Sequence, residues 1–275
     1  MSTFQRTWPF INESILKRHG KRIIVLARMH RKGLMPQIFP RQADIPFWQQ
    51  QTYNGYIGIA FAVGSFLFGM GSVLQYLALG WQGLGNIANL TFFAGSIPFT
   101  IAASLQHFQS ANMPDFRSLA GKKQDNKPFA FIGWHPRSAG WMSTFTQWIG
   151  TIAFNISTFS AIKAPDNKLL DTLEVWAPNL EGSILFLVSG YLAYIEAGNY
   201  YFSWKPKDLS WQVVFVNLLG CIAFMISAVA PTSMNTHDPV SAAFYSNTYT
   251  LLGAVCFFIS ALLLVKESKE ASAGD

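Results

Sequence analysis

Four long segments of the 275-residue sequence contain no Asp, Glu, Lys or Arg: residues 45–114, 138–162, 209–237 and 239–265. The hydrocarbon core of a bilayer is about 30 Å thick and is crossed by about 20 apolar helical residues, so these segments are long enough to span a membrane. Charged residues make up only 12% of the chain, about half of the roughly 25% in soluble domains. The chain is therefore predicted to be an integral membrane protein.

Six apolar runs bounded by turns or charges are expected to be membrane helices: residues 53–79, 87–107, 139–162, 181–202, 210–230 and 244–265. The runs are continuous rather than alternating, which favours helices over a β-barrel. The glycine-rich residues 80–86 form a short connection between the first two runs. The predicted fold class is an all-α integral membrane protein with six transmembrane helices, arranged as three helical hairpins.

Lys and Arg side chains are distributed very unequally between the two sides of these spans. Eighteen of the twenty lie in the two termini and in the loops after the second and fourth spans, whereas only Lys163 and Lys168 lie on the other side. Because basic residues remain on the cytoplasmic side, both termini are expected to be cytoplasmic. The expected location is the bacterial inner (plasma) membrane, as a multi-pass protein.

Residues 1–43 form a basic segment before the first span. Ile11, Ile15, Ile23 and Leu26 fall near one helical face, and basic residues fall on another, which predicts an amphipathic segment lying on anionic lipid. The expected lipid-binding residues are Lys17, Arg18, Lys21, Arg22, Arg28, Arg31 and Lys32. The alternative is a solvated tail that only sets topology. No basic motif interleaved with aromatic residues is present, so nucleic acid is not expected as a partner.

An internal repeat is visible when the spans are compared with one another. The first element of each copy is an interfacial motif, which occurs as Trp134, Pro136 and Arg137 and again seventy residues later as Trp204, Pro206 and Lys207. Residues 150–157 align with 220–227 without a gap. A further copy, the first in chain order, starts at residues 39–41 and continues to 59–64. The returning helices agree at residues 95–99, 182–186 and 253–257. Three parallel hairpin repeats are therefore predicted.

The repeats divide the chain into four segments. These are the basic segment 1–43, a first hairpin in 44–110, a cytoplasmic loop and second hairpin in 111–203, and a third hairpin with a short tail in 204–275. Residues 54–65, followed one hairpin later by 93–99, resemble the two-helix YrhK-like domain of bacterial membrane proteins, most clearly over residues 54–105. The resemblance implies a hairpin architecture and a bacterial inner-membrane setting, and it implies no catalytic residue.

Glu196 is the first candidate for a polar or ion site, since ionisable residues within membrane segments are functional hypotheses by default. Alignment of the returning helices places it at the level of Glu267 and of Gln109. This level corresponds to the cytoplasmic interface, where the carboxylate is expected to reach water. A proton or ion site is the alternative.

Asn155 and His107 are the other two candidates. Asn155 stands in the middle of the third span, where the sequence alignment puts Ala62 and Met225 in the other copies, so it is expected to bond between helices or to line a polar path. His107 and His135 are on the cytoplasmic side, where a site with Glu196 is an alternative to separate structural roles. No metal site is predicted, because no histidine pair has helical i, i+4 spacing.

The sequence contains no recognisable catalytic motif: no nucleophile triad, phosphate loop or pair of carboxylates is present. A non-enzymatic membrane protein without a cofactor is expected, structural or accessory in role, which binds anionic membrane lipid or a protein partner that the sequence does not identify. The alternative is a small-solute or ion transporter or channel with a path at the repeat interfaces, where parallel-repeat transporters place their sites.

Overall fold

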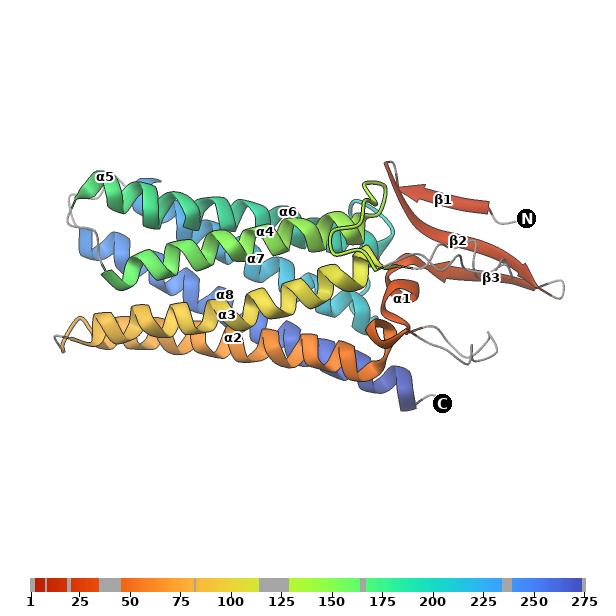
Figure 1. Cartoon of the computed structure of the whole chain (residues 1–275), viewed down its shortest axis with the longest axis horizontal. Helices are drawn as coiled ribbons and strands as arrows, with labels where there is room; N and C mark the ends of the chain where they lie inside the picture. The colour runs from red at the N-terminus through yellow and green to blue at the C-terminus, as the bar shows by residue number, and fades with distance from the viewer. Residues whose placement is uncertain are drawn as a thin grey trace.

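The computed structural model describes residues 3–7, 9–18, 21–34, 46–81, 83–113, 129–163, 167–233 and 239–273. Within these residues, six long helices lie side by side, and a short helix and a three-stranded sheet lie beyond one end of them (Figure 1). Both chain termini are found at this same end, which is called the terminal end below (Figure 1). The chain therefore passes along the bundle an even number of times.

The long helices are α2 (Gln51–Leu77), α3 (Leu84–Ala111), α4 (Ala139–Ser160), α6 (Ala177–Gly198), α7 (Leu209–Ser233) and α8 (Pro239–Ala273). Five segments of the described chain are long and apolar enough to cross a membrane: Gln51–Leu77, Leu84–Ala111, Leu169–Gly198, Leu209–Thr232 and Ser241–Glu270. The third of these includes α5 (Lys168–Asp171) and a π-helical turn, Thr172–Trp176, which continue into α6. The chain is a polytopic membrane protein by helix length and hydropathy.

Helix α4 is the member of the bundle that falls outside this apolar set. It has 22 residues, about 33 Å at 1.5 Å per residue, which is comparable to the bilayer core. Several polar residues lower its hydropathy, and three of them at i, i+4 spacing, Ser143, Gln147 and Thr151, are buried inside the bundle. The polar face of α4 therefore points away from lipid.

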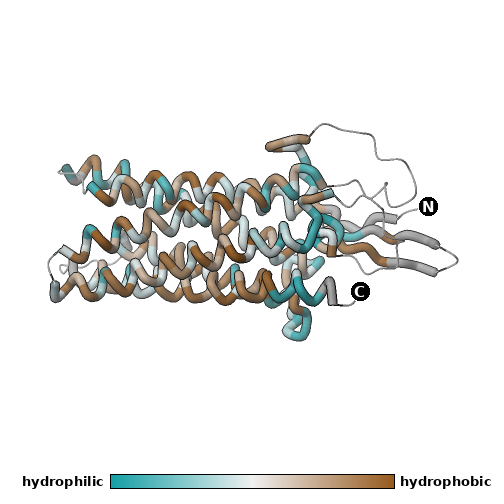
Figure 2. The backbone as a smooth tube through the Cα atoms, turned by 60° about the horizontal axis from the view of Figure 1, so that its bottom comes forward, coloured by the Kyte–Doolittle hydropathy of each residue, from teal (hydrophilic) through white to brown (hydrophobic). Residues whose placement is uncertain are grey.

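The six long helices form a closed ring. Each helix packs against the next one along the chain, and α8 packs against α2, which closes the ring. Hydrophobic residues run along the helices, and hydrophilic residues gather at the ends of the bundle (Figure 2). This distribution is the one expected for a bundle surrounded by lipid along its length and by water at its ends.

Each antiparallel helix pair is joined by the same two contacts, in which a glycine of one helix faces a phenylalanine of the other. In all six helices this phenylalanine follows the glycine by four residues. A Cβ atom built on these glycines would lie 2.3–3.1 Å from the facing ring, so only glycine allows the helices to approach this closely. The contacts are Gly64–Phe99 and Gly95–Phe68, Gly150–Phe186 and Gly182–Phe154, and Gly220–Phe257 and Gly253–Phe224.

The six phenylalanines of these contacts meet on the axis of the ring. They form the phenylalanine cluster, which consists of Phe68, Phe99, Phe154, Phe186, Phe224 and Phe257, all buried. Neighbouring ring centroids lie 4.9–6.4 Å apart, mostly in tilted or edge-to-face arrangements, a favoured geometry for aromatic pairs. The cluster fills the middle of the bundle with apolar side chains contributed by every helix.

The predicted alignment of the first copy differs from these contacts. That alignment matched Phe61 to Phe154, but the phenylalanine that makes the equivalent contact in α2 is Phe68. The error is seven residues, close to two helical turns, so both alignments present nearly the same helix face. Asn155 consequently corresponds to Gly69 rather than to Ala62. The predicted start of this copy, residues 39–41, lies outside the described residues.

The N-terminal segment is not the amphipathic helix that the sequence predicted. It forms antiparallel strands β1 (Thr3–Thr7), β2 (Phe10–Arg18) and β3 (Lys21–Leu26), in the order β1-β2-β3. Ile15 pairs with Ile24 across β2 and β3. A spacing of four residues, as between Ile11 and Ile15, fits one face of a helix and also one face of a strand, and the β-branched Ile and Val residues favour the strand.

Candidate functional site

A short helix, α1 (Ala27–Lys32), follows β3 and inserts its basic side chains into the terminal end of the bundle. Arg28, Arg31 and Lys32 are all nearly completely buried. A buried cation is unfavourable unless it is paired and hydrogen-bonded. Each of the three meets a carboxylate from the helix ring, so α1 is held by buried ion pairs.

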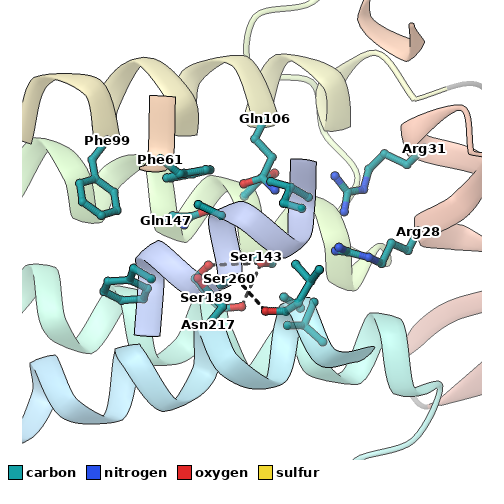
Figure 3. Close-up of a pocket in the computed structure, with 17 residues that line it drawn as sticks. Arg28, Arg31, Phe61, Phe99, Gln106, Ser143, Gln147, Ser189, Asn217 and Ser260 are labelled. Atoms are coloured by element: carbon teal, nitrogen blue, oxygen red, sulfur yellow. Dashed lines mark hydrogen bonds between the residues drawn. The ribbon is translucent and has the colours of Figure 1, made fainter. Parts of the chain in front are cut away.

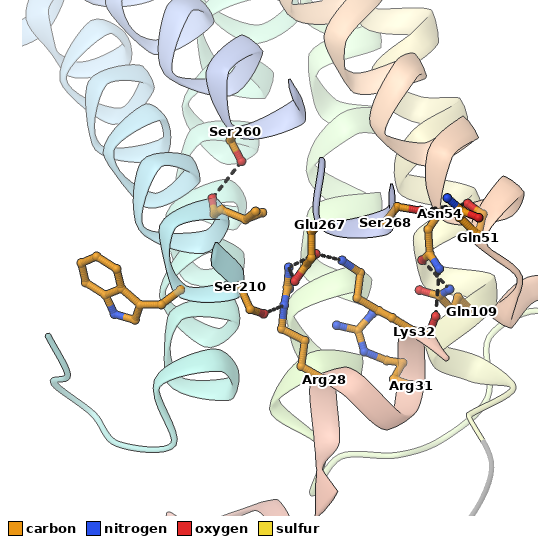
Figure 4. A network of polar contacts seen from close by, with 12 residues as sticks. Arg28, Arg31, Lys32, Gln51, Asn54, Gln109, Ser210, Ser260, Glu267 and Ser268 are labelled. Carbon is orange, nitrogen blue, oxygen red and sulfur yellow. Dashed lines mark hydrogen bonds and ion pairs between the residues drawn. The ribbon is translucent and has the colours of Figure 1, made fainter. Parts of the chain in front are cut away.

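Two glutamates, Glu196 and Glu267, pair with these cations, and Figure 4 shows Glu267 between Arg28 and Lys32. Arg31 donates from Nη2 to Glu196 Oε2 over 2.7 Å and from Nε to Oε1 over 3.3 Å. Arg28 and Lys32 both bind Glu267, at 3.2 Å and 2.5 Å from Oε2, respectively. The helix α1 is thereby linked to α6 and α8, which belong to different hairpins.

The backbone of α1 is fixed by side chains of the segment that follows it. Asn54 donates to the carbonyl of Lys32 over 2.8 Å, and Gln49 donates to the carbonyl of His30 over 2.9 Å. These bonds satisfy carbonyl groups that the end of a helix leaves without intrahelical partners. Gly33 ends α1 with a φ of +69°, and a Cβ there would collide with the Gln49 carbonyl.

Equivalent positions of the three hairpins surround α1. Gln109, Glu196 and Glu267 each lie fourteen residues after the glycine that faces the phenylalanine cluster in α3, α6 and α8. Gln109 donates to Asn54 over 3.0 Å instead of binding a cation. The sequence spacing therefore puts three polar side chains at one level, and α1 supplies cations to the two that are acidic.

Glycine at position 140 leaves room for one of the ion pairs. A Cβ atom there would lie 2.1 Å from Glu196 Oε1 and 2.9 Å from Arg31 Nε. The corresponding position in α7 is Ser210, whose hydroxyl accepts a bond of 2.7 Å from Arg28 Nε. Each hairpin thus adapts the same position to the cation beside it.

A cavity of about 50 Å³, lined by polar and apolar side chains, lies on the bundle axis next to these ion pairs. At about 10–15 Å³ per molecule, this is room for a few waters. Hydroxyl and amide side chains from five helices line it, and the guanidinium groups of Arg28 and Arg31 point toward it from α1 (Figure 3). The polar lining residues are Gln106, Ser143, Thr144, Gln147, Ser189, Asn217 and Ser260, together with the two arginines.

The phenylalanine cluster closes the other end of this cavity. Phe99 and Phe257 of the cluster, together with Phe61, are among its lining residues. On α6, Glu196 follows Phe186 by ten residues, about 15 Å along the helix. Over about this distance along the axis, the phenylalanine cluster is followed by the cavity and then by the charged layer at α1. The charged layer consists of Arg28, Arg31, Lys32, Glu196 and Glu267.

The charged layer has unequal numbers of cations and anions. Its three described cations face two carboxylates. Burial and repulsion by Arg28 lower the pKa of Lys32 from 10.5 to about 7, although Glu267 acts in the opposite direction. Arg31 Nη1 is buried and has no hydrogen-bond partner among the described residues.

Glu196 was expected to reach water, and this expectation is wrong: the residue is only 2% exposed. It lies at the end of α6, as the alignment with Glu267 predicted, but α1 covers that end. No sequence pattern indicates this contact, because Arg31 and Glu196 are 165 residues apart in the chain.

His107 lies beside the cavity rather than in it. Its ring stacks on Trp148, with centroids 5.5 Å apart, and Nδ1 is 3.3 Å from the hydroxyl of Thr144, which lines the cavity. His135 instead bonds to the carbonyl of Ala111. The described residues contain no group of three His, Cys, Asp or Glu that could hold a metal ion.

Asn155 is distant from the charged layer, since it follows Phe154 of the phenylalanine cluster. Its amide donates to Thr100 of α3 over 2.8 Å, which joins α4 to the neighbouring hairpin. It is not among the residues that line the axial cavity. The structure thus brings Glu196 and His107 near the cavity and leaves Asn155 at the level of the phenylalanine cluster.

The two interfacial motifs precede α4 and α7 at the terminal end. Trp134 and Trp204 are exposed and pack edge-to-face on Trp141 and Trp211, respectively. Pro136 and Arg137, like Pro206 and Lys207, lie in the turns that lead into these helices. Exposed tryptophans beside basic residues are typical of the border between lipid and water.

The predicted lipid-binding set is divided by the structure. Arg28, Arg31 and Lys32 are buried against glutamates, so the expectation that they face lipid headgroups is wrong. The side chains of the other four residues lie outside the described part of the chain: Lys17, Arg18, Lys21 and Arg22.

The cavity-lining residues were missed by the sequence analysis, although a signal for them exists. In α4, Ser143, Gln147 and Thr151 recur every four residues within an otherwise apolar run, and such a stripe marks a helix face turned toward a polar interior.

The comparisons with known proteins give no relative. No protein-family model, no curated protein and no solved structure matches this chain. The resemblance to the YrhK-like domain therefore stays a prediction.

Proposed function

We propose that this protein is a bacterial inner-membrane transporter or channel, in which a small polar solute crosses along the axis of the helix ring. The observation that carries this proposal is the cavity on the axis, between the phenylalanine cluster and α1. The proposal involves no covalent chemistry. In it, all six long helices span the membrane, they form three duplicated hairpins, and both chain termini are cytoplasmic.

The composition of the cavity supports a path. Charged side chains inside membrane proteins are costly and mark substrate or ion routes, and the guanidinium groups of Arg28 and Arg31 line this cavity. Here hydroxyls and amides from three hairpins converge on one space, as in transporters whose sites lie between parallel repeats. A bundle with only a structural role would be expected to fill this space with apolar side chains, as the phenylalanine cluster does in the middle.

The two closed ends of the cavity support a gated path. The phenylalanine cluster separates the cavity from the far end of the bundle, and hydrophobic constrictions can gate by excluding water. At the terminal end, α1 is held by the pairs of Arg31 with Glu196 and of Arg28 and Lys32 with Glu267. Because α1 is short and these pairs are its links to α6 and α8, its displacement would open the cavity toward the terminal end.

A structural or accessory role with binding of anionic lipid is the second candidate. It is favoured by the exposed Trp134 and Trp204 beside Arg137 and Lys207 at the terminal end. This surface fits a layer of anionic headgroups. It is compatible with the transport proposal, because it involves the outside of the bundle rather than the axis.

The test is solute flux into liposomes that contain the purified full chain. The wild type is expected to admit one or more small solutes, among urea, glycerol, formate and nitrate, faster than empty liposomes do. The double variant Gln147→Met with Asn217→Leu, which makes the cavity wall apolar, should reduce this flux at least fivefold. Asn155→Ala is the matched control, because it removes an amide away from the cavity, and it should leave flux unchanged.

A third variant tests the gate. Glu267→Gln removes the charge that holds two cations of α1, and it should raise flux several-fold without changing the helix ring. If neither the wild type nor Glu267→Gln admits any of these solutes faster than empty liposomes, the transport proposal is wrong and the structural role takes its place.

A further inference from the structure

Among the residues that the structure describes, the charged layer contains one more positive than negative side chain. Arg28, Arg31 and Lys32 face Glu196 and Glu267, and all five are buried. A buried charge without a partner is strongly unfavourable, so the layer calls for one further negative charge or for the loss of a proton. Burial, together with repulsion by Arg28, lowers the pKa of Lys32 and so favours the second of these responses.

Arg31 has a free donor at the place where a negative charge would fit. Its Nε and Nη2 bind Glu196, while Nη1 is buried and bonds to nothing described. The Arg31 side chain is only 2% exposed and lines the cavity, toward which its guanidinium points (Figure 3). Buried N–H groups are nearly always satisfied by protein, water or ligand, so this donor calls for a partner inside the cavity.

The remainder of the cavity wall also favours an anion over a cation. Beside the guanidinium groups, it offers the side-chain amides of Gln147 and Asn217, whereas the Ser143 hydroxyl donates to the carbonyl of Ser189. No carboxylate is among the lining residues that the structure describes. Amide donors beside two guanidinium groups favour an anion over a cation, and Arg31 keeps one N–H free of its own carboxylate partner.

We propose that the cavity binds one small monovalent anion, of the size of chloride, formate or nitrate, through Arg31 Nη1. One negative charge balances the layer, and the cavity volume of about 50 Å³ excludes larger organic anions. The inference deepens the proposed function, on which its role in transport rests, because it names the solute class of the same axial path. Binding itself is measured separately from transport.

The experiment compares anions at constant ionic strength. The purified full chain in detergent is melted in increasing sodium nitrate or sodium formate, with sodium gluconate as the balancing salt. Gluconate is too large for the cavity and controls for charge screening. A saturable rise in Tm with nitrate and formate is expected, because a ligand that binds only the folded state stabilises it.

Two variants locate the site. Arg31→Gln with Glu196→Gln removes the free donor and the carboxylate together, so no unpaired charge is left, and it should abolish the saturable rise. Asn217→Leu keeps the ion pairs, reduces the cavity, and should weaken nitrate binding at least fivefold. Asn155→Ala should bind nitrate as the wild type does.

The inference is overturned if nitrate and formate act no differently from gluconate on the wild type. It is also overturned if nitrate affinity persists in Asn217→Leu and, where the double variant folds, in that variant as well. Nitrate binding without flux of any solute in liposomes would support the site and reject the transport role. Flux of urea or glycerol without nitrate binding would support transport and reject the anion site.

Discussion

Lys32 makes the terminal end of the molecule sensitive to pH. Its ammonium is buried beside Arg28 and Arg31 of α1 and pairs with Glu267 of α8. Burial and the Arg28 charge lower its pKa to about 7, whereas an unfolded lysine keeps a pKa near 10.4. Between these two values the unfolded state binds more protons than the folded state, so stability rises with pH in this window.

The substitution Lys32→Met isolates this contribution. The wild type should gain stability between pH 7 and pH 10 with a slope of up to about 1.4 kcal/mol per pH unit, the value for one proton. Arg28 still pairs with Glu267 in the variant, which should lack this slope and be at least as stable as the wild type at pH 7. Denaturation in detergent at several pH values measures both. Parallel pH profiles for the two proteins would contradict the assignment.

The residues of the charged layer were only half predictable. The spacing of the returning helices places Glu196 and Glu267 at one level, and the structure finds both at the end of the bundle beside α1. The partners were not predictable, since Arg28 and Glu267 are 239 residues apart. A basic residue near the N-terminus has the same appearance in sequence whether it faces lipid or a buried carboxylate.

At the scale of helices, the glycine and phenylalanine contacts determine how closely each pair approaches. Gly253 is the tightest of them, because a Cβ there would lie 2.3 Å from the Phe224 ring. That ring cannot move away freely, since Phe68, Phe154 and Phe257 surround it at 5.0–5.8 Å. An added methyl group must therefore push α7 and α8 apart.

Gly253→Ala should destabilise the bundle by about 1–3 kcal/mol, the usual range for overpacking a filled core. Gly55→Ala is the matched control in α2, because a Cβ there meets nothing within 4 Å and alanine is the better helix former by about 0.5–1 kcal/mol. Thermal denaturation in detergent should lower Tm for the first variant and leave it unchanged or raised for the second. Equal effects of the two substitutions would mean that the close contact carries no stability.

The elements differ in how well the sequence predicted them. Long apolar runs identified the positions of all six bundle helices, although α8 extends to Ala273, beyond the predicted end at residue 265. The N-terminal strands were not predicted, because the spacing of their apolar residues fits the period of a helix as well as that of a strand. The predicted alignment of the first copy was wrong by seven residues, because residues seven positions apart lie on nearly the same face of a helix.

At the scale of the whole molecule, ring closure creates the space in which the site lies. Six helices that each pack mainly against two neighbours leave an axis that side chains must fill. The phenylalanine cluster fills its middle, and polar residues and α1 occupy the part toward the terminal end. The packing of α8 against α2 was not predictable from hydropathy, which describes single spans and not their neighbours.

The orientation of the ring in the membrane is the remaining prediction. Both termini lie at one end of the bundle (Figure 1), and the interfacial motifs with Arg137 and Lys207 lie at the same end. Because basic residues stay in the cytoplasm, this end should face inward. Lys163 follows α4 at the opposite end of that helix, which should face outward.

Single cysteines at Asn126, Asn167 and Ser272 test this orientation in a variant without Cys221 and Cys256. In intact cells an impermeant thiol reagent should modify the cysteine at Asn167, in the segment between α4 and α6, and spare the other two. All three should react in permeabilised cells, which controls for access to each site. The opposite pattern would invert the orientation. Labelling of only one of Asn126 and Ser272 would require an odd number of crossings between them, and α4, the least apolar helix, would then be the span to reject.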